Sequence, residues 1–286
     1  MPSRLRWVVV AAALVATAGA GCSGGSSSAK VHLTGSPTPR TALTSDSAVP
    51  SPSPNSPAAG PPAAGSLAGR TVVVDPGHNG ANEAHPEIIN KLVNAGNGVR
   101  KPCNTTGTSG SDGFTEAEFN WEVAQRLRGL LQAAGARVIL TRDNNTGVGP
   151  CITERAAAAN NNHADLMLSI HADGAPANDR GFHVITQPHP PVDTGTVAAS
   201  QRLGHAVVTA YHDRTGLPYA NYVGTEGMVT DRGDLGGLNL STRPAALIEC
   251  GNMRNPADET YLHSAAGQET IASALATAIT TYLTAR

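Results

Sequence analysis

Short apolar runs alternate with amphipathic segments along residues 70–284. Runs of apolar and β-branched residues are typical of buried strands, and apolar residues spaced three and four positions apart are typical of helices. The predicted strands cover residues 71–78, 137–142, 165–171, 181–187 and 245–250, and the predicted helices cover residues 115–134, 152–164, 197–214 and 266–283. Because strands and helices alternate, this pattern predicts one α/β domain with a largely parallel central sheet flanked by helices.

Two polar segments interrupt the alternation. Residues 80–113 form a long insertion rich in Asn and Gly, in which a short helix is expected at residues 86–94. Long loops in compact domains are frequently functional. Residues 226–240 are also polar and rich in Gly. We interpret this second segment as a solvated loop, and the alternative is that it lines a groove.

The N-terminus has the pattern of an export signal. Two arginines precede an apolar run from Trp7 to Ala20, which is too short to span a bilayer as a mature helix. Residues 1–22 are therefore a predicted signal peptide. Small residues before Cys22 resemble the lipobox of bacterial lipoproteins, in which the cysteine is lipidated, although Gly19 stands where Leu or Val is usual. Cleavage by an ordinary signal peptidase is the alternative to lipidation of Cys22, and an uncleaved anchor is a third.

Residues 23–66 are rich in Ser, Pro and Gly and carry few charges, so they bury too little apolar surface to fold. We predict a disordered linker there and one folded domain at residues 67–286, which is long enough to form its own core. The expected location is the cell envelope, with the protein either secreted or held by a lipid at the outer face of the cytoplasmic membrane.

Charge narrows the choice of partners. The chain has 20 Lys and Arg against 22 Asp and Glu, a formal net charge of -2. Proteins that bind nucleic acid usually carry a basic excess, so no nucleic-acid partner is expected. Contact with a membrane is expected only through a lipid on Cys22.

Polar residues at the ends of predicted strands are the first candidates for a site, because ligands bind beyond the carboxyl ends of parallel strands. His78, His171 and Glu249 each follow or end such a strand. Glu116 opens the first long helix on its apolar stripe, three positions before Phe119. Its neighbour Glu118 lies on the polar face and is expected to point to solvent.

Two histidines and a glutamate are the ligands of many catalytic zinc sites, in which a fourth position is left for water. Glu249 would then take a proton from that water and pass it to a leaving amine. His78, Glu116 and His171 lie far apart in the sequence and form no short signature such as HExxH. Position alone therefore leaves ordinary structural roles open.

The local sequences around these residues are more specific. In order, they are VVVDPGHNG, GFTEAEFNW, LMLSIHADG and ALIECGNMRNP. They resemble the four signature segments of the zinc-dependent N-acetylmuramoyl-L-alanine amidases of the amidase-3 family, over about residues 70–284. The resemblance implies a mixed sheet of about six strands flanked by helices. It also implies one zinc ion per chain held by His78, Glu116 and His171, with Glu249 as the catalytic acid and base.

Enzymes of this family cleave the amide between N-acetylmuramic acid and the L-Ala of the stem peptide, so the implied partners are peptidoglycan or muropeptides. A zinc peptidase that cuts within the stem is one alternative function. A wall-binding lipoprotein without activity is another, which the presence of all four residues disfavours.

The cysteines and two further polar residues complete the predictions. Export implies an oxidising compartment, and Cys103 and Cys151 both lie in predicted loops, so we expect a disulfide between them that fixes the insertion near the site. Cys250 lies within an apolar strand and is expected to be a buried thiol. Arg155 is expected to pair with a carboxylate or a helix end, and Asp75 to orient the turn before His78. The remaining histidines are interpreted as surface or packing residues.

Overall fold

The computed structural model describes residues 60, 62–188, 194–223 and 229–285. The predicted signal peptide, the lipidation candidate Cys22 and most of the predicted linker lie outside these residues. Within the described ranges, no helix combines the length and apolar character that crossing a bilayer requires.

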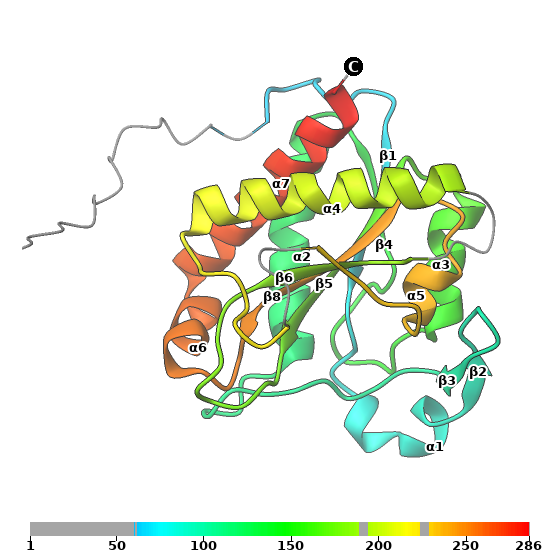
Figure 1. Ribbon diagram of the computed structural model, residues 1–286, viewed down its shortest axis with the longest axis vertical. Coiled ribbons are helices and arrows are strands. Elements are labelled where there is room, and N and C mark those ends of the chain that lie inside the picture. The colour runs from blue at the N-terminus through cyan, green and yellow to red at the C-terminus, as the bar shows by residue number, and fades with distance from the viewer. Residues whose placement is uncertain (1–59, 61, 189–193, 224–228, 286) are drawn as a thin grey trace, which may run out of the picture. The chain divides into compact units, whose positions relative to one another are not determined.

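A six-stranded sheet forms the centre of the described domain, with the strand order β4-β1-β5-β8-β6-β7 (Figure 1). Strands β4, β1, β5 and β8 are parallel to one another, whereas β6 runs antiparallel to β8 and parallel to β7. The sheet is therefore mixed and largely parallel, as predicted. The strands are β1 (Thr71–Pro76), β4 (Arg137–Leu140), β5 (Leu166–Asp173), β6 (His183–Thr186), β7 (Val229–Asp231) and β8 (Ala245–Asn252).

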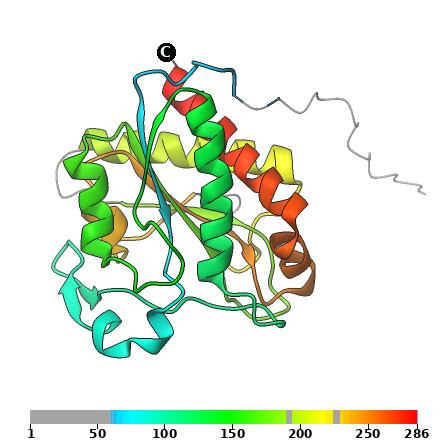
Figure 2. The same cartoon turned by 180° about the vertical axis from the view of Figure 1, so that it is seen from behind.

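Helices cover both faces of this sheet, but unequally. The main core joins one face to three long helices, and Figure 2 shows two of them, α2 and α7, side by side. These three are α2 (Glu116–Ala133), α4 (Thr194–Thr215) and α7 (Ala265–Thr284). The other face carries a smaller apolar cluster under α3 (Ile152–Asn161) and α5 (Gly236–Asn239). Helix α6 (Pro256–His263) follows β8.

The alternation of side chains along β8 shows how the two faces differ. Ala246, Ile248 and Cys250 belong to the main core, whereas Ala245 and Leu247 belong to the smaller cluster on the other face. Glu249 continues this second series, because alternate residues of a strand point to the same face. The less covered face therefore carries the charged end of β8.

The insertion contains more structure than predicted. It begins with a 3-10 turn η1 (Asn82–Ala84) and α1 (Pro86–Ile89) and continues as a hairpin of β2 (Leu92–Asn94) and β3 (Arg100–Pro102). These elements lie together at the end of the domain opposite the last turn of α7 (Figure 1). The helix predicted at residues 86–94 thus stops after one turn. The chain then reverses in the hairpin, where Gly96, Asn97 and Gly98 all have positive φ angles.

Two other predictions are corrected. The described part of segment 226–240 is not a solvated loop, because it contains the edge strand β7 and helix α5 and lines the cavities described below. Helix α3 ends at Asn161 instead of continuing to residue 164. His163 has a φ of 47°, a left-handed conformation that does not continue a right-handed helix.

Candidate metal centre

His78 is held in the turn that follows β1. Its φ is 57°, which is uncommon for a residue with a side chain, and it is 9% exposed. The ring Nδ1 lies 2.9 Å from the carbonyl oxygen of Thr105, and the backbone carbonyl of His78 accepts a hydrogen bond of 2.8 Å from Nη2 of Arg155. Both the ring and the backbone of His78 are therefore fixed by other segments.

Glu116 is the first residue of α2, where the helix points its N-terminal turn at the site. Thr115 caps the helix by accepting a hydrogen bond from the backbone N–H of Glu118. The Glu116 side chain is buried, and its Oε2 accepts a hydrogen bond of 3.0 Å from the backbone N–H of Thr108. Glu118 is exposed. The helical spacing thus distinguished the inward glutamate from the outward one.

The two histidines meet Glu116 from different elements. Nε2 of His78 lies 3.1 Å and Nδ1 of His171 lies 2.8 Å from Oε1 of Glu116. One potential ligand atom from each of the three residues lies within 4.8 Å of the others. The sheet and α2 therefore bring together three groups that lie far apart in the sequence.

A glycine makes this close approach possible. Gly107 has a φ of 84°, and a Cβ built on it would lie 2.7 Å from Oε2 of Glu116 and 2.9 Å from Cδ2 of His78. Any larger residue would displace one of the two side chains.

Charges within this cluster stabilise its ionised glutamate. Burial by itself disfavours the charged form of Glu116, but the neighbouring His78 and His171 hold its pKa well below the ordinary value. Imidazole nitrogens and a carboxylate oxygen are also the donors that zinc and similar divalent ions prefer. The cluster has the donor chemistry of a metal centre.

Glu249 lies beside this cluster on the neighbouring strand. In the register of β5 and β8, His171 pairs directly with Glu249, so both side chains project from the same face. Oε2 of Glu249 is buried and has no hydrogen-bond partner among the described residues. Burial and the nearby charges of Glu116 and Asp173 raise the pKa of Glu249 well above its ordinary value, whereas Arg232 opposes this shift.

A cavity of about 280 Å³ opens next to these side chains. Its lining includes all three residues of the cluster and Glu249, together with Arg232 from the segment that precedes α5. A second cavity of about 230 Å³ extends from His78 and His171 toward the face covered by α3 and α5. The candidate ligands therefore line space that a substrate can enter.

Some residues near the site were missed from the sequence. His183 pairs with Glu249 across β6 and β8, is 5% exposed, and its Nδ1 has no hydrogen-bond partner within the described ranges. Burial lowers the pKa of His183. Arg232 was likewise not singled out. Only the register of the antiparallel pair brings His183 next to Glu249, and no local sequence pattern specifies that register.

The pairing predicted for Arg155 is borne out, and it links Asp75 indirectly to the turn before His78. Arg155 pairs with a carboxylate, because its Nη1 lies 2.6 Å from Oδ1 of Asp75, and both side chains are buried. Burial alone would raise the pKa of Asp75, but Arg155 and the hydroxyl groups of Ser169 and Thr141 outweigh it and lower the pKa to about 2. Asp75 thus acts on the turn before His78 through Arg155.

The cysteines are arranged as the sequence predicts. Cys103 and Cys151 form a disulfide, and Cys250 is a buried free thiol. Burial raises the pKa of Cys250. The disulfide joins the insertion to the start of α3, next to the turn that carries His78.

Comparisons with known proteins agree with this geometry. Residues 72–281 match the amidase-3 family, described as N-acetylmuramoyl-L-alanine amidase. The N-acetylmuramoyl-L-alanine amidase Rv3717 of Mycobacterium tuberculosis is 42% identical over 217 residues, which are 76% of this chain and 88% of that protein.

Solved structures give the same result. The crystal structure of the N-acetylmuramyl-L-alanine amidase Ami1 from Mycobacterium smegmatis is 38% identical with a TM-score of 0.72, covering 77% of this chain and 99% of that one. The apo form of Ami1 from Mycobacterium abscessus is 38% identical with a TM-score of 0.69, covering 76% of this chain and 100% of that one. The similarity extends over the whole described domain.

Proposed function

Because the chain belongs to the amidase-3 family of N-acetylmuramoyl-L-alanine amidases, we propose that His78, Glu116 and His171 hold a catalytic zinc ion and that Glu249 is the acid and base of the reaction. The chain is an N-acetylmuramoyl-L-alanine amidase that acts on peptidoglycan. The observation that supports the assignment of roles is the convergence of the three candidate ligands beside Glu249 in one cavity.

The surroundings of His78 fit a zinc ligand. A histidine that binds a metal through one ring nitrogen usually donates a hydrogen bond from the other to a carbonyl or carboxylate. In His78, Nε2 faces the cluster while Nδ1 lies 2.9 Å from the Thr105 carbonyl. Three protein ligands with open space on one side are the arrangement of a catalytic zinc site.

A zinc ion bound there would polarise the amide carbonyl and lower the pKa of a water molecule to about 7, so that water can attack at neutral pH. Glu249 would accept the proton of this water, an assignment supported by its projection from the same face as His171. A cation held by the three ligands would favour the ionised form of Glu249 and offset the burial that raises its pKa. The protonated Glu249 then donates to the departing amine.

The proposed scissile bond is the amide between the lactyl group of N-acetylmuramic acid and the L-Ala of the stem peptide. We further propose that the protein works outside the cytoplasm, in the cell envelope. The disulfide supports this location, because such bonds persist in oxidising compartments. A signal peptide at residues 1–22 and lipidation of Cys22 stay predictions.

Mass spectrometry of a defined muramoyl-peptide incubated with the full-length protein tests this function. Release of a peptide that begins with L-Ala, lost with a chelator and restored by Zn²⁺, is the expected result. Cleavage at another bond of the stem would identify a peptidase instead. Identical cleavage with and without the chelator would contradict the zinc assignment.

A further inference from the structure

We propose that the disulfide between Cys103 and Cys151 positions the candidate zinc ligand His78, because it joins the two segments that contact the ring and the backbone of this residue. The inference rests on the proposed zinc site and extends it to residues outside the ligand set. We call the two contacts the ring contact, made by Thr105, and the backbone contact, made by Arg155.

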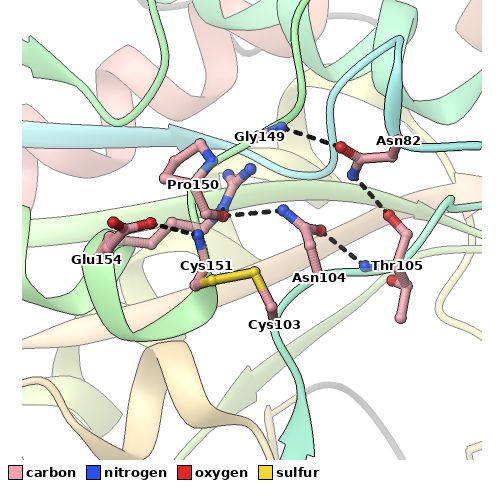
Figure 3. Close-up of a disulfide and its surroundings, with 9 residues drawn as sticks. Asn82, Cys103, Asn104, Thr105, Gly149, Pro150, Cys151 and Glu154 are labelled. Carbon is pink, nitrogen blue, oxygen red and sulfur yellow. Dashed lines mark hydrogen bonds between the residues drawn. A yellow bond between two sulfur atoms is a disulfide. The ribbon is translucent and has the colours of Figure 1, made fainter. Parts of the chain in front are cut away.

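The ring contact lies just after Cys103 in the chain. The carbonyl oxygen of Thr105 lies 2.9 Å from Nδ1 of His78, and the Thr105 hydroxyl lies 3.2 Å from the same nitrogen. The same carbonyl accepts a second hydrogen bond, of 2.8 Å, from the side-chain amide of Asn82 (Figure 3). The orientation of the His78 ring therefore depends on where residue 105 is held.

The backbone contact lies in the first turn of α3, four residues after Cys151. Nη2 of Arg155 donates to the carbonyl oxygen of His78 at 2.8 Å, and Nη1 donates to that of Pro76 at 2.8 Å. Arg155 is itself fixed by its buried ion pair with Asp75. A left-handed conformation such as that of His78 costs energy and persists only when the surroundings impose it. Arg155 supplies part of that constraint.

The disulfide and a set of hydrogen bonds connect the two contacts. The backbone N–H of Ile152 donates to the carbonyl of Cys103 at 2.8 Å, and the side-chain amide of Asn104 donates to the carbonyl of Pro150 at 2.9 Å. The backbone N–H of Gly149 donates to Oδ1 of Asn82 at 2.9 Å (Figure 3). The segments before α3 and after β3 thus form one unit around His78.

The disulfide is the covalent part of this unit and lies outside the apolar core of the sheet. Cys103 is buried but belongs to neither apolar cluster of the sheet. The chain around residue 105 lies between β3 and α2, outside any named helix or strand, so no regular backbone hydrogen bonding fixes its position. Without the bond, residue 105 gains freedom to move away from the His78 ring.

In protein that remains folded, loss of the disulfide is therefore expected to weaken metal binding. Changing groups that orient a metal-binding histidine typically lowers metal affinity about 10- to 100-fold. We expect a decrease of this size in zinc affinity for the double variant Cys103→Ser and Cys151→Ser, with the circular dichroism spectrum of the wild type retained.

The test measures zinc affinity of the full-length proteins by competition with a chromogenic chelator, and the absorption spectrum of bound Co²⁺ as a report on ligand geometry. The matched control is Ile279→Ala, which removes buried apolar volume from α7 in the main core and leaves both contacts intact. While the control remains folded, a loss of stability does not change the intrinsic affinity. We expect altered zinc affinity and an altered Co²⁺ spectrum in the double variant only.

A second measurement keeps the test decisive if the double variant does not fold: the zinc affinity of the wild-type protein after its disulfide is reduced with a phosphine, which should fall by the same factor. Asn82→Ala retains the disulfide but removes the amide that fixes the Thr105 carbonyl, and we expect zinc affinity to fall several-fold. Wild-type affinity in a folded double variant, or in the reduced wild type while it remains folded, would overturn the inference. If the wild type itself binds no zinc, the proposed function fails instead, so the two failures are distinguishable.

Discussion

Gly77 lies directly against the imidazole of His171: a Cβ built on Gly77 would lie 2.2 Å from Cε1 and 2.4 Å from Nε2 of that ring. Neighbouring Cβ contacts in proteins do not approach so closely, so a larger residue forces the ring to move. The turn after β1 and the end of β5 therefore pack together only because residue 77 has no side chain.

Gly77→Ala is expected to disrupt the metal centre, because the added methyl group displaces His171 from Glu116. Zinc affinity should fall at least about 10-fold, the loss typical of a misplaced ligand, as measured by chelator competition. Gly129→Ala is the matched control, since a Cβ at Gly129 meets no atom within 4 Å. Equal zinc affinity in both variants would show that the ring tolerates the methyl group.

Glu249→Gln should leave zinc binding and folding intact and abolish most of the turnover. An amide has the shape of the carboxylate but does not accept a proton from water at neutral pH, and the loss of a general acid and base typically costs about 100- to 10,000-fold in rate. The measurement is kcat with a muramoyl-peptide. Glu118→Gln, at an exposed position of α2, is expected to retain wild-type kcat. Wild-type kcat in Glu249→Gln would assign the proton transfer to another group.

Asp75 gives the domain a component of stability that depends on pH. Its pKa falls from 3.8 to about 2 on folding, so the folded state favours the ionised form. This contribution, of about 2 kcal/mol, is complete above the unfolded pKa and is lost as the pH falls through the folded pKa. The stability difference between wild type and Asp75→Asn should shrink by about 1 kcal/mol between about pH 5 and about pH 3. Urea unfolding of both proteins at each pH measures this difference in the free energy of unfolding. A difference that does not change with pH would argue against the lowered pKa of Asp75.

Cys250 should resist alkylation in the native protein. Its side chain is fully buried and burial raises its pKa, so the reactive thiolate is scarce. Labelling by iodoacetamide then requires unfolding and should be at least about 1,000-fold slower than in urea. Peptide mass mapping separates Cys250 from the other cysteines. Rapid labelling without unfolding would contradict the buried position.

The sequence alone was sufficient to predict the elements that have a clear pattern of apolar residues. The spacing on α2 identified Glu116 as the inward glutamate, and the apolar runs located β1, β5 and β8 with His78, His171 and Glu249 near their ends. These predictions succeed because burial of an apolar face imposes a regular spacing on the residues.

The sequence alone did not predict the shortest elements or the pairing between strands. Strand β7 has only three residues, too few for a periodic pattern, and it lies where we expected a solvated loop. The position of His183 beside Glu249 depends on an antiparallel register that only the folded sheet fixes. The contact of Arg155 with the His78 carbonyl likewise links residues whose meeting requires the whole sheet.

The three candidate ligands come from β1, α2 and β5, so an unfolded chain has no pair of them close together in the sequence. Metal uptake is therefore coupled to folding. On the proposed zinc site, a newly made, unfolded chain would compete poorly for zinc with other proteins, and it would gain affinity only where the sheet closes. If the protein folds outside the cytoplasm, as proposed, the supply of free zinc there, and not at the site of synthesis, would determine how much of it becomes active.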